Sequence, residues 1–166
     1  MDYLDVIKEK IITDETLGPL LTYWRLKDNR IVFTNGCFDI LHRGHIEYLS
    51  KTASLGDIVV VGLNSDRSVR KIKGNDRPLQ DEYSRALVMA SLKQVTGVCL
   101  FDEETPYNLI SRVKPDVLVK GGDYKVEEIV GADVVKAYGG EVVTIDFLKG
   151  YSTSVLIERI QNINSK

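Results

Sequence analysis

Short, uninterrupted apolar runs alternate with helical stretches along most of this chain, and this alternation restricts the fold more than any other feature. The run Ile58–Leu63 is apolar at every position except one glycine, as in a strand that is covered on both faces. The predicted strands are Arg30–Gly36, Asp57–Asn64, Gly97–Phe101, Asp116–Gly121 and Glu141–Asp146. Strands that alternate with helices predict an α/β fold, a Rossmann-like doubly wound and mostly parallel sheet.

Helical patterns fill the intervals between these strands. The predicted helices are Thr13–Lys27, His45–Gly56, Leu79–Val95, Pro106–Val113, a stretch within Val126–Tyr138, and a terminal helix capped by Ser152 or Thr153. In the first of them, Leu17, Leu21 and Trp24 recur at helical spacing, ahead of the first predicted strand. We therefore divide the chain into an N-terminal helical extension, residues 1–29, and a main domain, residues 30–166.

Charge and cysteine content limit the class of protein. With a formal net charge of −2 over 166 residues, the chain has no general attraction for nucleic acid or for an acidic membrane. Its apolar runs are too short to cross a bilayer, and the first ten residues lack the apolar segment of a signal peptide. Cys37 and Cys99 form neither a zinc-binding spacing nor a disulfide framework. These features predict a reduced, cytoplasmic protein.

Both histidines of the chain lie three residues apart in the stretch TNGCFDILHRGHIEYL, directly after the first predicted strand. His42 and His45 would open a helix, where backbone N–H groups and the helix dipole favour an anion. Gly44 would let a ligand approach the backbone. The spacing does not match the H-E-x-x-H pattern of zinc hydrolases, and a purely structural role in capping the helix is a third interpretation. We favour anion binding.

Other clusters suited to phosphate follow along the chain. The stretch RSVRKIKGNDRP contains five basic residues, a charge density that suits phosphate groups. Its glycine and proline indicate a shaped loop, although most charged runs are simply solvated surface. KGGDY follows a predicted strand, and GYSTS opens the last helix with three hydroxyl residues, more than a cap requires. The chain lacks both the G-x-G-x-x-G and the G-x-x-x-x-G-K-[ST] signatures. The sequence therefore predicts a phosphate-binding site that uses neither of these glycine-rich loops.

The stretch GCFDILHRGH resembles the H-x-G-H signature of the nucleotidyltransferase superfamily, which includes the cytidylyltransferases. LGDIVVVGLNSDRSVRKIKGNDRP, LVKGGDY and GYSTS, in this order, resemble most closely one branch of it, the adenylyltransferase domains of bacterial ADP-heptose synthesis. The resemblance covers residues 30–161. It implies a homo-oligomer, a dimer or larger, that transfers AMP from ATP, bound with Mg²⁺, to a sugar 1-phosphate such as D-glycero-D-manno-heptose 1-phosphate. A cytidylyltransferase acting on glycerol 3-phosphate or another phospho-alcohol, and a nucleotide-binding module without activity, are the alternatives.

The resemblance also assigns roles to individual residues. His42, His45 and Lys73 are the expected catalytic residues, which would stabilise charge on the phosphates in the transition state. The expected nucleotide-binding residues are Asn35, Gly36, Cys37, Phe38, Gly44, Arg85, Gly122, Asp123, Ser152, Thr153 and Ser154. For Arg85, a surface position in the middle of a helix is an equally good interpretation.

Three further residues are expected at the sugar phosphate. These are Asp39, Arg77 and Lys120, although Asp39 could instead form a turn or fix a histidine or a lysine. Phe147 stands where the glycerol-specific cytidylyltransferases carry a basic residue. This difference weakens a CTP-specific interpretation and is compatible with ATP.

Overall fold

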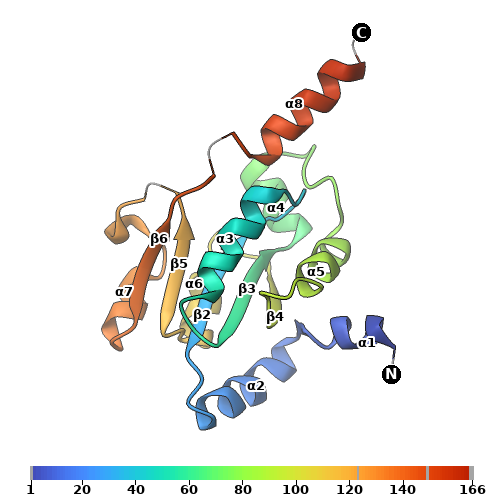
Figure 1. Ribbon diagram of the computed structural model, residues 1–166. Helices are drawn as coiled ribbons and strands as arrows, with labels where there is room; N and C mark the ends of the chain where they lie inside the picture. Colours follow the sequence, from blue (N-terminus) through green and yellow to red (C-terminus); the bar gives the residue numbers. More distant parts are fainter. Residues whose placement is uncertain (1, 123, 149, 165–166) are drawn as a thin grey trace.

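The computed structural model describes residues 2–122, 124–148 and 150–164. Six strands form one sheet in the order β1-β4-β3-β2-β5-β6, and each neighbouring pair is parallel (Figure 1). The strands are β1 (Ile11–Ile12), β2 (Ile31–Gly36), β3 (Ile58–Asn64), β4 (Gly97–Phe101), β5 (Val117–Gly121) and β6 (Glu141–Ile145). The predicted fold class, a Rossmann-like parallel sheet, is confirmed.

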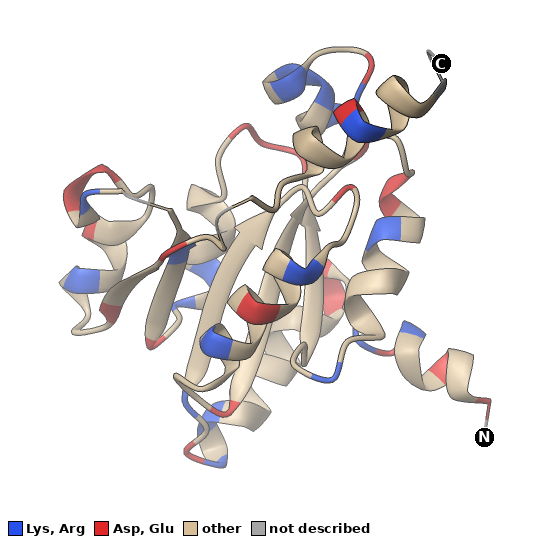
Figure 2. Ribbon diagram, turned by 45° about the horizontal axis from the view of Figure 1, so that its top comes forward, with Lys and Arg blue, Asp and Glu red and all other residues tan. Residues whose placement is uncertain are grey.

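Helices connect these strands in sequence. They are α1 (Tyr3–Lys8), α2 (Asp14–Leu26), α3 (Arg43–Ala53), α4 (Asp66–Lys73), α5 (Glu82–Ala90), α6 (Tyr107–Val113), α7 (Ala132–Ala137) and α8 (Thr153–Asn164), with a 3₁₀ turn at Val126–Glu128. Within the described ranges, no helix is long and apolar enough to cross a membrane. Acidic and basic residues are interspersed along the helices (Figure 2), so a strongly charged site must be built locally.

Two hydrophobic cores lie on the two faces of the sheet, and successive residues of β2 alternate between them. Ile31 and Phe33 belong to the core that includes Ile110 of α6. Val32 belongs to the other core, with Leu49 of α3. β3 is buried at all seven positions, as its continuous apolar sequence predicted. The central strands therefore form a rigid base, and their carboxyl ends hold the connecting loops in place.

The N-terminal region contributes a strand to the sheet. β1 pairs with β4, and Ile12 and Trp24 lie in the same core as Phe33. The sequence predicted α2 but neither α1 nor β1, because a strand of two residues is too short to produce a pattern. The expected helical extension of residues 1–29 thus also supplies one edge of the sheet.

The basic stretch after β3 is helical, whereas the sequence suggested a loop. Ser65 caps α4 by accepting the backbone N–H of Ser68 at 3.1 Å. The helix ends at Gly74, whose φ of 93° is a left-handed conformation that glycine adopts without strain. The loop therefore begins only after Lys73, which is the last residue of α4.

Helix α5 is shorter than the predicted Leu79–Val95. Asp81 caps its start by accepting the backbone N–H of Ser84 at 2.9 Å. At the other end, the ammonium of Lys10 donates to the carbonyl oxygens of Ala90 and Val95 at 3.0 and 2.8 Å. These contacts give partners to carbonyls at and beyond the end of the helix, where the chain turns towards β4.

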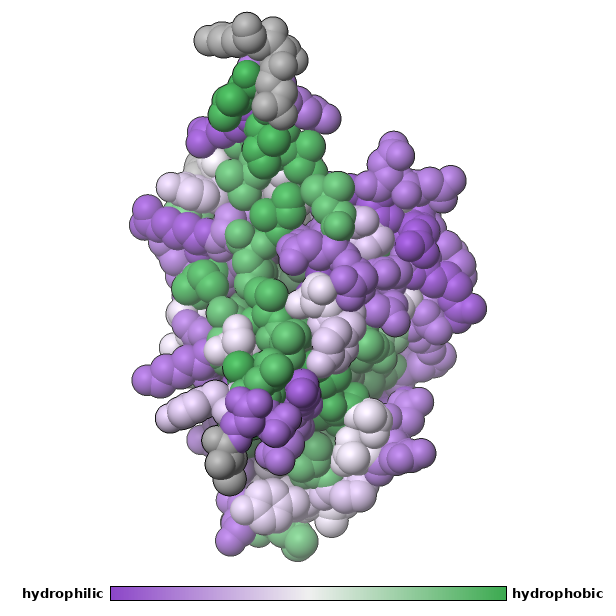
Figure 3. Space-filling model, turned by 90° about the vertical axis from the view of Figure 1, so that its right-hand side faces the viewer, coloured by the Kyte–Doolittle hydropathy of each residue, from purple (hydrophilic) through white to green (hydrophobic). Residues whose placement is uncertain are grey.

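Helix α8 leaves the body of the molecule (Figure 1) and exposes Ile160 and Ile163. On this side a band of apolar side chains extends from α8 towards α1 (Figure 3). Large exposed apolar bands are typical of surfaces that contact another molecule. The homo-oligomer that the sequence suggested stays a prediction.

The burial of Trp24 predicts the cost of removing it. Trp24→Ala should lower the free energy of unfolding by about 3–5 kcal/mol, because the large side chain fills a core shared by α2 and the sheet. The matched control is Tyr23→Ala, whose side chain is exposed on the same helix and should change stability by less than about 0.5 kcal/mol. Urea unfolding followed by circular dichroism measures both, and equal losses would contradict the placement of α2.

Candidate functional site

A pocket of about 440 Å³ lies beyond the carboxyl ends of β2 and β5. In the sheet order, β3 lies on one side of β2 and β5 on the other, so the connections change direction at β2. Crevices at such switch points bind the ligands of open α/β sheets. The pocket is lined by nine of the predicted site residues, namely Asn35, Gly36, Cys37, Phe38, Asp39, His45, Lys73, Lys120 and Thr153.

A larger cavity of about 590 Å³ lies beyond β3 and β4. Both of its arginines are already paired, since Arg67 contacts Asp102 and Arg112 contacts Asp14, each at 2.7 Å. Paired charges offer little to a charged ligand, so we place the candidate site in the smaller pocket.

His45 lies in the first turn of α3, where its ring is held as a neutral hydrogen-bond donor. Its Nδ1 accepts the backbone N–H of His42 at 3.4 Å, which leaves Nε2 to carry the proton of the neutral ring. Burial, then the neighbouring His42 and Lys73, lower the pKa of His45 to about 4. At neutral pH this ring therefore offers a directed N–H group without a charge.

His42 is the unsatisfied member of the pair. Its ring stacks on that of His45, with centroids 3.9 Å apart and planes inclined by 26°. Both ring nitrogens are shielded from solvent and have no hydrogen-bond partner among the described residues, and burial lowers the pKa of the ring. Because a buried polar group without a partner is costly, a ligand that accepts a hydrogen bond from His42 would recover that cost.

Two glycines make room for the rings around this pair. A Cβ atom at Gly44 would lie 3.0 Å from Nδ1 of His42, and one at Gly36 would lie 2.9 Å from the ring of Phe38. Phe38 in turn meets the His45 ring edge-on, with centroids 5.3 Å apart. A side chain at either position would therefore push against one of these aromatic rings.

Two lysines give the pocket positive charge. Lys120 of β5 is largely buried and donates to Oδ1 of Asn35 at 3.3 Å; burial lowers the pKa of its ammonium. Lys73 lines the same pocket from the end of α4. The acidic residues of the lining are Asp39, which is paired with Arg77, and the exposed Glu104. The arrangement favours an anion.

Arg85 was interpreted either as a ligand of nucleotide phosphates or as a surface residue. Its side chain is in fact completely buried. Its guanidinium donates to the carbonyl oxygens of Cys37, Asn64 and Gln80 at 2.7, 2.8 and 3.0 Å. It also pairs with Asp66 at 2.7 Å. Four of its five N–H groups are thus used within the protein, so it shapes the pocket instead of presenting itself to nucleotide phosphates.

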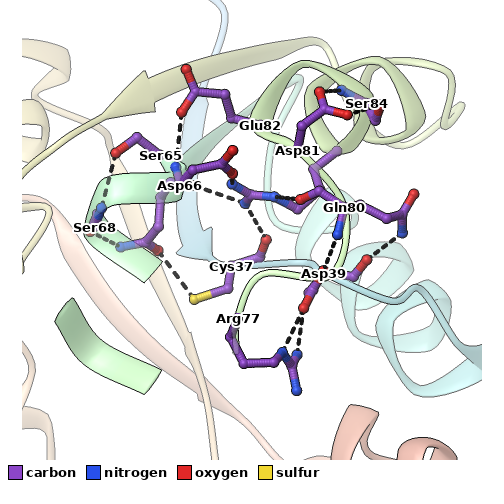
Figure 4. A network of polar contacts seen from close by, with 12 residues as sticks. Cys37, Asp39, Ser65, Asp66, Ser68, Arg77, Gln80, Asp81, Glu82 and Ser84 are labelled. Atoms are coloured by element: carbon purple, nitrogen blue, oxygen red, sulfur yellow. Dashed lines mark hydrogen bonds and ion pairs between the residues drawn. The ribbon is translucent and has the colours of Figure 1, made fainter. Parts of the chain in front are cut away.

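Asp39 and Arg77 are also bound to each other, although both were predicted to contact the sugar phosphate. The Asp39 carboxylate is buried, accepts from Nε of Arg77 at 2.7 Å and lies 2.7 Å from the same residue's Nη2 (Figure 4). It also accepts the backbone N–H groups of Leu79 and Gln80. The contacts of this carboxylate therefore join remote residues, and they show neither a local turn nor a bond to a histidine or a lysine.

The start of α8 contributes one hydroxyl to the pocket. Ser152 accepts the backbone N–H of Val155 at 3.2 Å, so the predicted cap is confirmed. Thr153 lines the pocket and donates to the carbonyl oxygen of Ile40 at 3.4 Å, while Ser154 is exposed outside the lining. The three hydroxyls therefore do not converge as a single anion nest in this arrangement.

Aromatic residues that the sequence did not single out as ligands surround Gly122. A Cβ atom there would lie 3.1 Å from the ring of Phe147 and 3.4 Å from that of Tyr124, and both rings are exposed and line the pocket. In the sequence, an aromatic residue soon after a glycine pair at a strand end could have indicated this contact. The predicted ribose contact, Asp123, lies outside the described residues.

The chain is also similar to known proteins. A family model described as cytidylyltransferase-like matches residues 33–159, which includes most of the chain. The chain belongs to the cytidylyltransferase-like family. The H-x-G-H histidines, Lys73, Lys120 and the start of α8 all lie inside the matched region of this family member.

Its curated relatives are larger proteins. The chain is 51% identical over 154 residues to the bifunctional protein HldE of Wolinella succinogenes and 54% identical over 156 residues to that of Rhodopseudomonas palustris. Each match covers 93% of this chain but 32% of the relative, so the chain spans about a third of their length.

Solved structures with the same fold include a lipopolysaccharide core biosynthesis protein from Thermoplasma volcanium, at 32% identity and a TM-score of 0.58. That match covers 75% of this chain and 99% of the other. Pantoate-beta-alanine ligase from Francisella tularensis, at 18% identity, has a TM-score of 0.59 over 94% of this chain and 78% of the other. The second likeness concerns the fold alone.

The titration of His45 tests its place in the site. By NMR, its ring protons should titrate with a midpoint of about 4, well below the usual value of 6.5. Since the unfolded chain binds this proton more readily, stability should fall as the pH decreases from 6.5 to 4, and His45→Asn should remove part of that loss. A midpoint near 6.5 would show that the ring is not held as described.

Proposed function

We propose that this chain is an adenylyltransferase that transfers AMP from ATP to a sugar 1-phosphate, D-glycero-D-manno-heptose 1-phosphate, and releases pyrophosphate. The observation that carries the proposal is the stacked pair of uncharged histidines. His45 lines the pocket together with Lys73 and Lys120, and His42, which stacks on His45 behind the lining, has both ring nitrogens unpartnered. Directed donors beside two cations suit a phosphate group whose charge increases during a reaction.

The choice of a sugar acceptor is supported by the relatives. The bifunctional proteins named HldE share more than half of their aligned residues with this chain, and the motifs KGGDY and GYSTS resemble the ADP-heptose branch. The name of the structural neighbour, a lipopolysaccharide core biosynthesis protein, is compatible with a sugar substrate. Lys120 would provide the positive charge that meets the phosphate of this acceptor.

The reaction proposed is a single displacement at the α-phosphorus of ATP. An oxygen of the acceptor phosphate forms a bond to that phosphorus, and the bond to the pyrophosphate oxygen breaks. The attacking phosphate is already ionised at neutral pH, so neither a strong general base nor a covalent intermediate is required. The protein must align the two phosphates and stabilise the charge that develops on them.

Each residue would serve one part of this task. Nε2–H of His45 and a ring N–H of His42 would donate to the oxygens of the α-phosphate, and Lys73 would stabilise the leaving pyrophosphate. Thr153 would add a hydroxyl donor from the start of α8. The exposed rings of Phe147 and Tyr124 would offer apolar surface to the adenine, because bases stack favourably on aromatic side chains.

Magnesium would enter with the nucleotide. Among the described residues there is no group of three or more histidine, cysteine or acidic side chains that could hold a metal ion. In this proposal the ion is held mainly by phosphate oxygens of ATP, where it would neutralise charge on the leaving group.

The proposal predicts which mixture of substrates releases pyrophosphate. With Mg²⁺, the purified chain should release it from ATP and heptose 1-phosphate, and not from CTP and glycerol 3-phosphate. A coupled phosphate assay after pyrophosphatase treatment measures both. Release only from the second mixture would reject the proposed substrates and favour a glycerol-phosphate cytidylyltransferase. Binding of ATP without release from either mixture would favour a module without activity.

Removing one histidine donor should slow the reaction without unfolding the protein. His45→Ala is expected to lower kcat by about 10²–10³-fold, as for other lost donors to a developing oxyanion. The matched control is Ser50→Ala, an exposed position on the same helix, which should keep normal turnover. Near-normal turnover in both His45→Ala and His42→Ala would contradict the assignment of the pair.

A further inference from the structure

Lys73 lies where an ordered helix passes into an exposed connection. It is the exposed last residue of α4, and the chain after it, residues 74–76, is exposed as well. Gly74 adopts a left-handed φ of 93°, and a Cβ atom there would meet no atom within 4 Å. On its N-terminal side the lysine is held by α4, whose Ser68 and Val69 are buried, and on the other side it is held only where the connection from α4 to α5 is next anchored.

That anchor is Asp39. Its carboxylate accepts the backbone N–H groups of Leu79 and Gln80 at 2.9 and 3.0 Å and Nε of Arg77 at 2.7 Å (Figure 4). The side chain of Gln80 donates back to the carbonyl oxygen of Asp39. Four hydrogen bonds thus join one residue to a connection that is about 40 residues away in the sequence.

The carboxylate is held in its charged form by these contacts. Burial raises the pKa of Asp39, but the N–H groups of Leu79 and Gln80, together with Arg77, outweigh burial, and the pKa lies below its usual value. Its backbone belongs to the loop between β2 and α3, three residues before His42. A single buried charge therefore joins the loop that carries the histidines to the connection that follows the lysine.

We propose that Asp39 is a positioning residue, which sets the place of Lys73 relative to the histidine pair by anchoring residues 77–80. This inference rests on the proposed function, in which Lys73 meets the phosphates. Asp39 acts through the connection and touches no substrate. A displacement of about 1 Å at a reacting group can cost 10²-fold in rate, so an anchor of this kind is sufficient to control activity.

A double-mutant cycle distinguishes positioning from a general structural role. Asp39→Asn removes the charge and places an amide next to backbone N–H groups. In the otherwise unchanged protein it should lower kcat/KM for pyrophosphate release by about 10²-fold. In a Lys73→Ala background it should lower the remaining activity less than about threefold, because the group that it positions is absent. Equal losses in the two backgrounds would overturn the proposal.

Two further variants keep the cycle interpretable. Asp81→Asn removes another carboxylate of the same connection, one that caps α5 without contacting Asp39, and should leave kcat/KM unchanged in both backgrounds. If Asp39→Asn fails to fold by circular dichroism, Arg77→Gln breaks the ion pair while the backbone contacts of Asp39 remain, and the same dependence on Lys73 is expected.

The test remains informative if the proposed substrates are wrong. The dissociation constant of ATP, measured by titration calorimetry, requires no acceptor. Asp39→Asn should raise this constant in the protein that retains Lys73 and not in the Lys73→Ala background. An identical rise in both would reject the role of Asp39, whereas the absence of pyrophosphate release from ATP and heptose 1-phosphate would reject only the proposed function.

Discussion

The buried guanidinium of Arg85 holds the carboxyl edge of the sheet together. Parallel strands that end side by side leave carbonyl groups pointing into the space where a ligand binds, and these groups need partners. Arg85 supplies them for Cys37 after β2, Asn64 at the end of β3 and Gln80 before α5, while Asp66 balances its charge. One side chain thus ties together the start of the histidine loop, the end of β3 and the end of the α4–α5 connection, and two of its partners, Cys37 and Asn64, line the pocket.

In the candidate site, the neutral hydrogen-bond donors and the positive charges come from different residues. Two imidazole rings stacked at 3.9 Å in a buried position could not both carry a proton charge without strong repulsion, so both remain neutral at physiological pH. Positive charge comes instead from Lys73 and Lys120, which enter from α4 and β5. Neutral donors can be placed close to a reacting phosphate and to each other, whereas the two lysines bring charge from α4 and β5. The two kinds of residue are therefore complementary.

The sequence predicted what local patterns determine and missed what distant contacts determine. Five of the six strands were predicted from apolar runs, and β1 was not predicted because two residues form no pattern. The motif at His42 and His45 pointed towards the candidate pocket, which His45 lines, since its spacing and its place after a strand are both local. The partners of Asp39 and Arg85 are remote in sequence, and no local pattern distinguishes a buried arginine from an exposed one in a helix. Their burial required the sheet order to be known.

The same remote contacts explain why this site depends on residues that touch no ligand. A buried ion pair is weak as a source of stability, because removing two charges from water costs about as much as their attraction returns. Breaking such a pair, however, leaves an uncompensated charge and lets the attached segments move. Asp39 with Arg77, and Arg85 with Asp66, each join segments that carry or flank the histidines and Lys73. An apolar replacement of either pair could preserve the folded state and still lose the site, because it is the geometry of the connecting loops that these charges specify.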